Sequence, residues 1–187
     1  MRYAWIWVAG LAALLCACEK ADGEGAAPGA GGGARMPVRS PAFVEGGMIP
    51  VKYSCQGEDL SPPIEWDSVP GAAKSLALIC DDPDAPVGTW VHWVIWNIPP
   101  EKKELAEAVP QKAELPDGAR QGMNDFRKMG YGGPMPPPGN AHRYYFKIYA
   151  LDIKPDLKSG ATKAKLLDAM KGHVLAEGQL MGTYKRR

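Results

Sequence analysis

The stretch that decides the fold is Asp81-Asp82-Pro83-Asp84-Ala85-Pro86, which leads within a few residues into Trp90-Val91-His92-Trp93-Val94-Ile95-Trp96-Asn97-Ile98-Pro99. An acidic, proline-rich turn is followed by the aromatic and β-branched residues of a buried strand. Under strict alternation, His92 lies on one face of this strand together with Trp90, Val94 and Trp96. A buried imidazole needs partners for both ring nitrogens, and the preceding turn supplies two predicted partners, Asp82 and Asp84.

The composition indicates one globular domain with a non-globular extension. The chain has 187 residues, of which 45% are hydrophobic and 23% are charged. It carries 22 basic and 21 acidic side chains, and Arg2 is the only charged residue before position 18. The chain from residue 18 onward therefore has balanced charges, which argues against non-specific binding of nucleic acid.

The amino-terminal residues predict an export signal. Arg2 precedes an apolar run, residues 3–15, that is shorter than the roughly 20 residues of a membrane-spanning helix. The run ends in Leu-Cys-Ala-Cys at residues 15–18, which resembles the lipobox of bacterial lipoproteins and marks Cys18 as the lipidated residue. A plain secretory peptide that is cleaved near Ala17 is the alternative.

These features divide the chain into three parts. Residues 1–17 are the expected lipoprotein signal peptide. Residues 18–39 are the lipidated cysteine and a flexible linker rich in glycine and alanine, and residues 40–187 are the folded domain. The expected location is the bacterial cell envelope, where the anchored domain faces the periplasm; the choice between inner and outer membrane stays open.

Within the domain, the pattern predicts a mainly β fold. Strands are expected at residues 48–53, 74–80, 90–98 and 142–151. Thr162 is expected to cap a helix that ends near Lys171, and Gly172 suits the position after it. Two segments are less regular: residues 101–118 are expected to form a long loop, and residues 173–184 fit either a strand or a helix.

Two cysteines remain in the domain. An exported protein could join Cys55 and Cys80 in a disulfide, but two separate packed thiols fit the sequence equally well. No motif places a histidine or the start of a helix beside either cysteine, so neither is expected to be a nucleophile.

Three interpretations compete for the two histidines that follow polar loops, His92 and His142. A metal site is disfavoured because the tight ligand spacing of metal-binding motifs is missing. Aspartates that cap their own turn beside buried histidines are the plain structural alternative. In the third interpretation the histidines and the backbone N–H groups of Gly132 and Gly133 form an anion pocket, in which the aspartates orient the imidazoles.

Several separated motifs resemble the phosphatidylethanolamine-binding protein family. They are Asp82-Pro83-Asp84-Ala85-Pro86, Trp90-x-His92-Trp93, Gly133-Pro134 and His142-Arg143-Tyr144. Its bacterial branch, described as Raf-kinase-inhibitor-like, is similar in Ser61-Pro62-Pro63, Asn97-Ile98-Pro99, Gln121-Gly122-x-Asn124-Asp125-Phe126, Gly130-Tyr131-Gly132-Gly133-Pro134 and Gly172-His173-Val174-Leu175-Ala176. The resemblance covers about residues 40–184.

The resemblance implies a fold and a site. The fold would be two packed, mostly antiparallel β-sheets with one or two peripheral helices. The site would be an anion pocket without metal or cofactor, and Pro86 would follow a cis peptide bond. The ligand-binding positions carried over are Asp82, Asp84, Pro86, Trp90, His92, Tyr131, Gly132, Gly133, Pro134 and His142. The chain departs from the bacterial pattern at Asn140-Ala141, where relatives often have Gly-Pro, and it lacks a match to the carboxy-terminal helix of the animal branch.

The function expected from this resemblance is a membrane-tethered, non-catalytic module. It would bind phosphate-bearing small molecules, phospholipid headgroups or phosphorylated groups on a partner, with no nucleic acid and no identified protein partner. One alternative is a hydrolase of phosphate or acyl esters that uses His92 or His142 as general base. A protease inhibitor or envelope interaction protein that uses residues 101–118 is the other.

The lipobox interpretation predicts that Cys18→Ala abolishes membrane association without unfolding the domain, because the linker separates the anchor from the core. Fractionation of cells that express the wild-type and variant proteins measures this directly. A Cys18→Ala protein that still sediments with membranes would contradict lipidation at this cysteine.

Overall fold

The fold is that of a computed structural model, which describes residue 1 and residues 34–187. The expected signal peptide and most of the expected linker lie outside the described residues. The larger sheet has six strands in the order β1 (Ala34–Arg35), β9 (Val174–Tyr184), β8 (His142–Leu151), β4 (Ser75–Asp82), β5 (Trp90–Ile98) and β7 (Arg120–Gln121). The smaller sheet has three strands, β2 (Val38–Arg39), β3 (Ile64–Trp66) and β6 (Glu104–Leu105).

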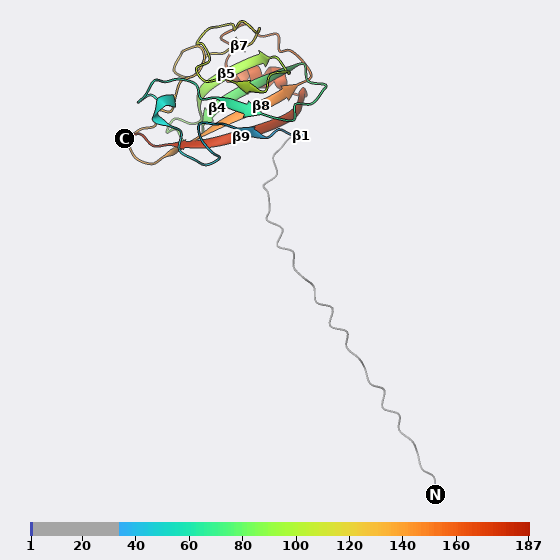
Figure 1. Cartoon of the computed structure of the whole chain (residues 1–187), viewed down its shortest axis with the longest axis horizontal. Helices are drawn as coiled ribbons and strands as arrows, with labels where there is room; N and C mark the ends of the chain where they lie inside the picture. The colour runs from blue at the N-terminus through green and yellow to red at the C-terminus, as the bar shows by residue number, and fades with distance from the viewer. Residues whose placement is uncertain (2–33) are drawn as a thin grey trace. The chain divides into compact units, whose positions relative to one another are not determined.

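The strand pairs are antiparallel except for β1 and β9, which are parallel. One 3-10 helix, η1 (Val51–Tyr53), and one α-helix, α1 (Lys163–Met170), complete the described elements. Figure 1 shows β9, β8, β4 and β5 side by side, with α1 behind them. The expectation of a mainly β fold with two sheets and a peripheral helix is confirmed. No helix within residues 34–187 is long and apolar enough to cross a bilayer.

Strand β4 lies inside the larger sheet, between β8 and β5, and all eight of its residues are buried. Leu76, Leu78 and Cys80 point into the core between the two sheets, whereas Ala77 and Ile79 pack in a second cluster with Leu166 and Met170 of α1. The sequence of β4 is therefore an almost continuous apolar run, as expected for a strand that is covered on both of its faces.

Helix α1 begins where the sequence predicts. The Thr162 side chain accepts a hydrogen bond from the backbone N–H of Lys165, and Gly172 has the positive φ of 77° that suits a helix end. Leu166 and Met170, one turn apart, are the buried residues of this helix. Lys163 ties the first turn of α1 to the sheet through an ion pair with the buried Asp81.

One expected strand is not found, and the structure defines two segments that the sequence left less regular. Residues 48–53 do not form a strand, because Pro50 has no N–H to donate and instead opens η1 by accepting from Tyr53 N–H through its carbonyl. The ambiguous segment that follows α1 is strand β9, whose residues pair along most of β8. The long connection at residues 101–118 contains β6 and several turns.

Strand β5 departs from strict alternation at two bulges. Cys80 pairs with Trp93 while Asp81 pairs with Val91, so His92 is an extra residue on β5. A second register shift lies near the end of the strand, where Asn97 adopts a left-handed φ of 57°. His92 and Trp90 line one pocket, in agreement with the predicted shared face. Val94 and Trp96 instead pack in the second cluster with α1, whereas the His92 ring contacts Tyr144 of the core between the sheets, so this part of the prediction was wrong.

The folded domain begins earlier than the predicted residue 40. Ala34 and Arg35 pair with β9, and the Met36 N–H donates to the carbonyl of Glu177 at 2.7 Å. A side chain at Gly178 would meet the Met36 carbonyl oxygen, since a Cβ there would lie 1.8 Å from it. Met36 itself is only 2% exposed. The segment at residues 34–39 is thus part of the folded domain rather than of the linker, with Met36 in the core.

Met36→Ala should lower the free energy of unfolding by about 2–4 kcal/mol, because it removes a buried methionine side chain from the core. Met48→Ala is the matched control, since Met48 is 61% exposed and its loss should change stability by no more than about 0.5 kcal/mol. Urea unfolding of both variants measures the difference. Equal stability of the two variants would place the start of the domain after residue 36.

Candidate functional site

A pocket of about 200 Å³ lies where β4 ends and where β5 and β8 begin. We call it the histidine pocket. It is lined by Asp82, Ala85, Pro86, Val87, Trp90, His92, Phe126, Met135, Pro136, Pro137 and His142. Strand order brings these elements together, because β4 lies between β8 and β5 and the pocket forms at their shared end.

Asp82 and His142 form the polar side of this pocket. Asp82 is 3% exposed, and its Oδ2 lies 2.8 Å from Nδ1 of His142. A carboxylate accepts hydrogen bonds, so Nδ1 of His142 carries a proton and Nε2 is the nitrogen left for other partners. The second oxygen of Asp82 accepts from the N–H of Asp84 at 2.9 Å, which closes the acidic turn.

Asp84 does not hold a histidine, contrary to the prediction. Its carboxylate accepts from the guanidinium and the backbone N–H of Arg143, at distances of 2.7–3.0 Å. The hydrogen bond from the Arg143 side chain lowers the pKa of Asp84 to about 2, so this carboxylate stays ionised and paired. Asp84 therefore fixes the rim of the pocket through Arg143 and does not line it.

His92 is held by the backbone. Its Nδ1 lies 2.6 Å from the carbonyl oxygen of Gly132, and because a carbonyl only accepts, Nδ1 carries the proton. The ring is 2% exposed and packs edge-on against Phe126 and Tyr144. This burial lowers the pKa of His92 below its usual value of 6.5.

The backbone N–H groups that were predicted to bind an anion are already in use. Gly132 N–H donates to the carbonyl of His92 at 2.9 Å, and Gly133 N–H donates to Oδ1 of Asp59 at 2.6 Å. A Cβ at Gly133 would lie 2.4 Å from the carbonyl oxygen of Tyr53, so only glycine fits there. The two glycines are bonded to His92 and Asp59 and offer no free N–H donor.

The other expected positions divide between the pocket and its surroundings. Pro86 and Trp90 line the pocket, but the described peptide bonds are all trans, so the cis bond expected before Pro86 is not found. Pro134 is buried outside the lining, and its carbonyl accepts from Cys55 N–H at 3.1 Å. Tyr131 lines a different cavity, described below.

Sequence reasoning missed the apolar side of the pocket. Phe126, which belongs to the Gln121–Phe126 motif, packs edge-on against both Trp90 and His92. Two loop residues at the rim, Val87 and Met135, are 79% and 46% exposed. The motif offered a signal for Phe126, whereas nothing in the spacing of Val87 or Met135 indicated that two loops meet there.

Two polar atoms near the histidines lack partners. The indole nitrogen of Trp90 and the hydroxyl of Tyr144 are buried and have no hydrogen-bond partner among the described residues. Burial and the neighbouring Asp82 carboxylate raise the pKa of Tyr144, so its hydroxyl keeps its proton. Buried donors of this kind are costly unless a ligand or water satisfies them.

The two cysteines of the domain are free thiols. Burial raises the pKa of both, and most strongly that of Cys80, which is 1% exposed. The sequence left open whether Cys55 and Cys80 form a disulfide or remain separate thiols, and in the structure they are separate. Groups of three or more side chains suited to hold a metal ion are not found among the described residues.

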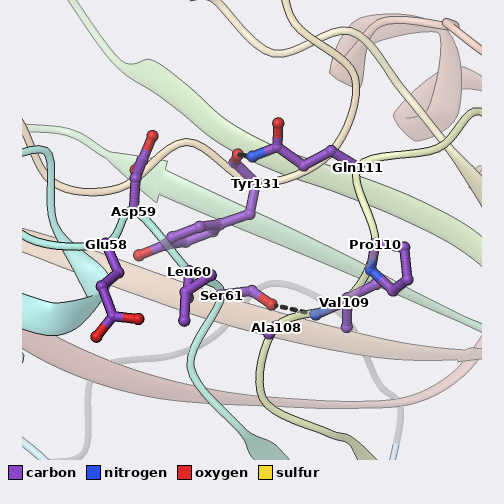
Figure 2. Close-up of a pocket in the computed structure, with 9 residues that line it drawn as sticks. All are labelled: Glu58, Asp59, Leu60, Ser61, Ala108, Val109, Pro110, Gln111 and Tyr131. Carbon is purple, nitrogen blue, oxygen red and sulfur yellow. Dashed lines mark hydrogen bonds between the residues drawn. The ribbon is translucent and has the colours of Figure 1, made fainter.

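A second cavity, of about 350 Å³, lies beside Tyr131 (Figure 2). Its walls are two segments far apart in the sequence, residues 58–61 and residues 108–111. Tyr131 lies between these walls, and its hydroxyl donates to the carbonyl of Tyr53 at 2.8 Å. Tyr131 is therefore separated from the histidine pocket, although the next residue, Gly132, holds His92.

Comparison with protein-family models matches residues 39–185 to the family described as phosphatidylethanolamine-binding protein. The chain belongs to this family. The match covers strands β3 to β9, helix α1 and both histidines of the pocket. The motifs that carried the resemblance in the sequence all lie within the matched residues.

Similar proteins occur in archaea and bacteria. A UPF0098 protein of Methanothermobacter thermautotrophicus is 56% identical over 151 residues, which cover 81% of this chain and 99% of that protein. A UPF0098 protein of Pyrococcus abyssi is 46% identical over 160 residues, covering 84% of this chain and 89% of that protein.

Two crystal structures have a similar fold. A homologue of phosphatidylethanolamine-binding protein from Chlamydia trachomatis has 44% sequence identity and a TM-score of 0.75, and the match covers 82% of this chain and 99% of that chain. YbcL of E. coli, described as a new member of the mammalian family, has 32% identity and a TM-score of 0.76, covering 82% of this chain and all of that chain.

The buried environment of His92 predicts its titration and its effect on stability. With a pKa below the usual 6.5, the ring is neutral at pH 7, and NMR of the imidazole should show protonation only at lower pH. Because the unfolded chain binds this proton more readily than the folded protein, stability should be full above about pH 6.5 and should fall on acidification below it.

His92→Gln is the matched variant, because its amide can still donate to the Gly132 carbonyl but cannot be charged. Its free energy of unfolding should fall less between about pH 7 and pH 5 than that of the wild-type protein. A His92 ring that titrates at or above pH 6.5 would contradict the proposed effect of burial.

Proposed function

We propose that this protein is a non-catalytic binding module that takes a phosphate-bearing small molecule or a phosphorylated group in the histidine pocket. The observation that carries the proposal is the orientation of the two imidazoles. Nδ1 of each ring is tied to the protein, at Gly132 and Asp82, and both rings line the same pocket. Two Nε2 atoms are thereby left to bind one ligand.

The charge of the pocket depends on protons. Asp84 is neutralised by Arg143, so the charge is set by Asp82, His92 and His142. With both histidines neutral the formal charge is −1, and with both protonated it is +1. An anion is therefore repelled in the first state and attracted in the second, and its binding should be coupled to proton uptake.

One feature of the pocket suits a phosphoryl group, and another suits an organic group attached to it. The Trp90 indole N–H is a buried donor without a partner, and the pocket that it lines is small enough to enclose a phosphoryl group. Around the polar residues the pocket is apolar, with Phe126, Val87 and Met135 at its side and rim. Such a surface suits the organic part of a phosphate ester.

The proposal of a non-catalytic role rests on the composition of the pocket. Its described lining residues include no serine, threonine, cysteine or lysine that could serve as a nucleophile. Both free thiols have a raised pKa, which makes them poor nucleophiles at neutral pH. A hydrolase that uses His92 or His142 as general base is the competing function that the experiment below must separate.

We further propose that this binding module is attached to a membrane anchor. We infer from the lipobox at Cys18 that the protein is an exported lipoprotein tethered at the cell envelope, and from the motifs within the domain that it belongs to the Raf-kinase-inhibitor-like branch. Kinase inhibition is not part of this proposal, because fold-level similarity does not carry a partner. The ligand would be a soluble phosphate ester, a phospholipid headgroup or a phosphorylated partner.

Calorimetric titration with O-phosphorylethanolamine at pH 8 and pH 6 tests the site. Affinity should rise at the lower pH, because each proton that an imidazole of the pocket takes up makes the charge of the pocket less negative. His92→Ala and His142→Ala should each weaken binding and flatten this pH dependence. His173→Ala is the control: it removes the third histidine, which pairs with Asp152 outside the pocket, and should leave affinity unchanged.

Asp82→Asn separates positioning from simple electrostatics. If Asp82 orients the His142 ring, its loss weakens binding even though a negative charge has been removed. Tighter binding in this variant, or an affinity that does not depend on pH in the wild type, would overturn the proposed site. Release of inorganic phosphate from the same ligand, abolished by either histidine substitution, would replace the binding module with a hydrolase.

A further inference from the structure

The second cavity offers a binding space that differs in chemistry from the histidine pocket. It has a volume of about 350 Å³, which is larger than the 200 Å³ of the histidine pocket and within the usual size range of small-molecule sites. Figure 2 shows Tyr131 between the two walls, with its hydroxyl on the side of Glu58 and Asp59.

The walls of this cavity are fixed by hydrogen bonds. Ser61 bridges them twice, since its Oγ accepts from Val109 N–H at 2.9 Å and its carbonyl accepts from Ala108 N–H at 3.0 Å. Gln111 donates through its side-chain amide to the carbonyl of Tyr131 at 2.9 Å. The space is therefore preformed, and a ligand that enters it does not have to order the walls.

The polar groups that line the cavity are mainly acceptors. Glu58 and Asp59 contribute two carboxylates, Gln111 contributes an amide oxygen, and the lining contains no lysine, arginine or histidine. The amide hydrogens of Ala108 and Val109 are already bonded to Ser61, so they are not free to bind an anion. The nearby Glu107 is paired with Lys52, so Glu58 and Asp59 are the charged residues of the lining.

Apolar side chains complete the surface, with Leu60 on one wall and Val109 and Pro110 on the other. Tyr131 closes the cavity between them and is 2% exposed, and burial raises the pKa of its hydroxyl, which stays protonated. From this combination we propose that the cavity is a second ligand site, for a small organic cation that joins a protonated amine to a compact apolar body.

NMR titration of the purified protein with three probes of the same shape tests the charge preference. Benzylamine is the cation at pH 7, benzyl alcohol is neutral and benzoate is the anion. Benzylamine should shift the backbone amides at residues 58–61 and at Ala108, Val109 and Gln111, and the shifts should saturate. Benzyl alcohol should bind about threefold or more weakly, and benzoate should leave these amides unmoved.

Conservative variants connect the preference to the two carboxylates. Asp59→Asn keeps the oxygen that accepts from Gly133 N–H, so the fold is preserved while the charge is lost. Asp59→Asn and Glu58→Gln should each weaken benzylamine about threefold and leave benzyl alcohol unchanged. Glu101→Gln is the matched control, because it removes an exposed carboxylate outside the cavity and should have no effect.

Several results would overturn the proposal: equal shifts from all three probes, no shift at the cavity, or unchanged benzylamine affinity in both cavity variants. Shifts confined to His92, Phe126 and His142 would place the amine in the histidine pocket instead. The outcome is independent of phosphate binding, which the calorimetric experiment measures with another ligand at other residues.

Discussion

The structure depends on the burial of two consecutive carboxylates at the end of β4. Alternation along the strand sends Asp81 toward the α1 side and Asp82 toward the histidine pocket, and both are at most 3% exposed. A buried charge is tolerated only with partners. Asp81 pairs with Lys147 and Lys163 and so joins α1 to the sheet. Asp82 pairs with His142 and so joins the acidic turn to the first residue of β8.

This arrangement explains why the stretch at residues 81–99 was informative about both the fold and the pocket. The run of β-branched and aromatic residues after the acidic turn indicated a buried strand, and the same reasoning found β4, β8 and the capped helix α1. The sequence also predicted that Asp82 pairs with a histidine. The expected partner was His92, on the strand that follows the acidic turn, whereas the structure pairs Asp82 with His142. Asp82 reaches His142, 60 residues away, because β4 and β8 are neighbours in the sheet.

What the sequence could not predict depends on register and on backbone contacts. The bulge at His92 adds one residue to β5, which turns this ring toward Tyr144, and no local pattern marks such an insertion. The glycines of residues 130–133 suggested free N–H groups. Their partners, the His92 carbonyl and the Asp59 side chain, lie 40 and 74 residues away, so only the fold shows that these donors are already bonded.

The segment at residues 131–133 connects the histidine pocket with the second cavity, for which we propose ligands of opposite charge. Tyr131 closes the cavity beside Glu58 and Asp59, the Gly132 carbonyl fixes Nδ1 of His92, and Gly133 N–H is bonded to Asp59. A displacement of this segment changes the hydrogen bond that sets the His92 tautomer. Because Asp59 takes part in both the cavity and the support of Gly133, a cation bound there would compete for the carboxylate that holds the segment. By thermodynamic linkage, any such effect on the histidine pocket is matched by an equal effect of a bound anion on the cavity.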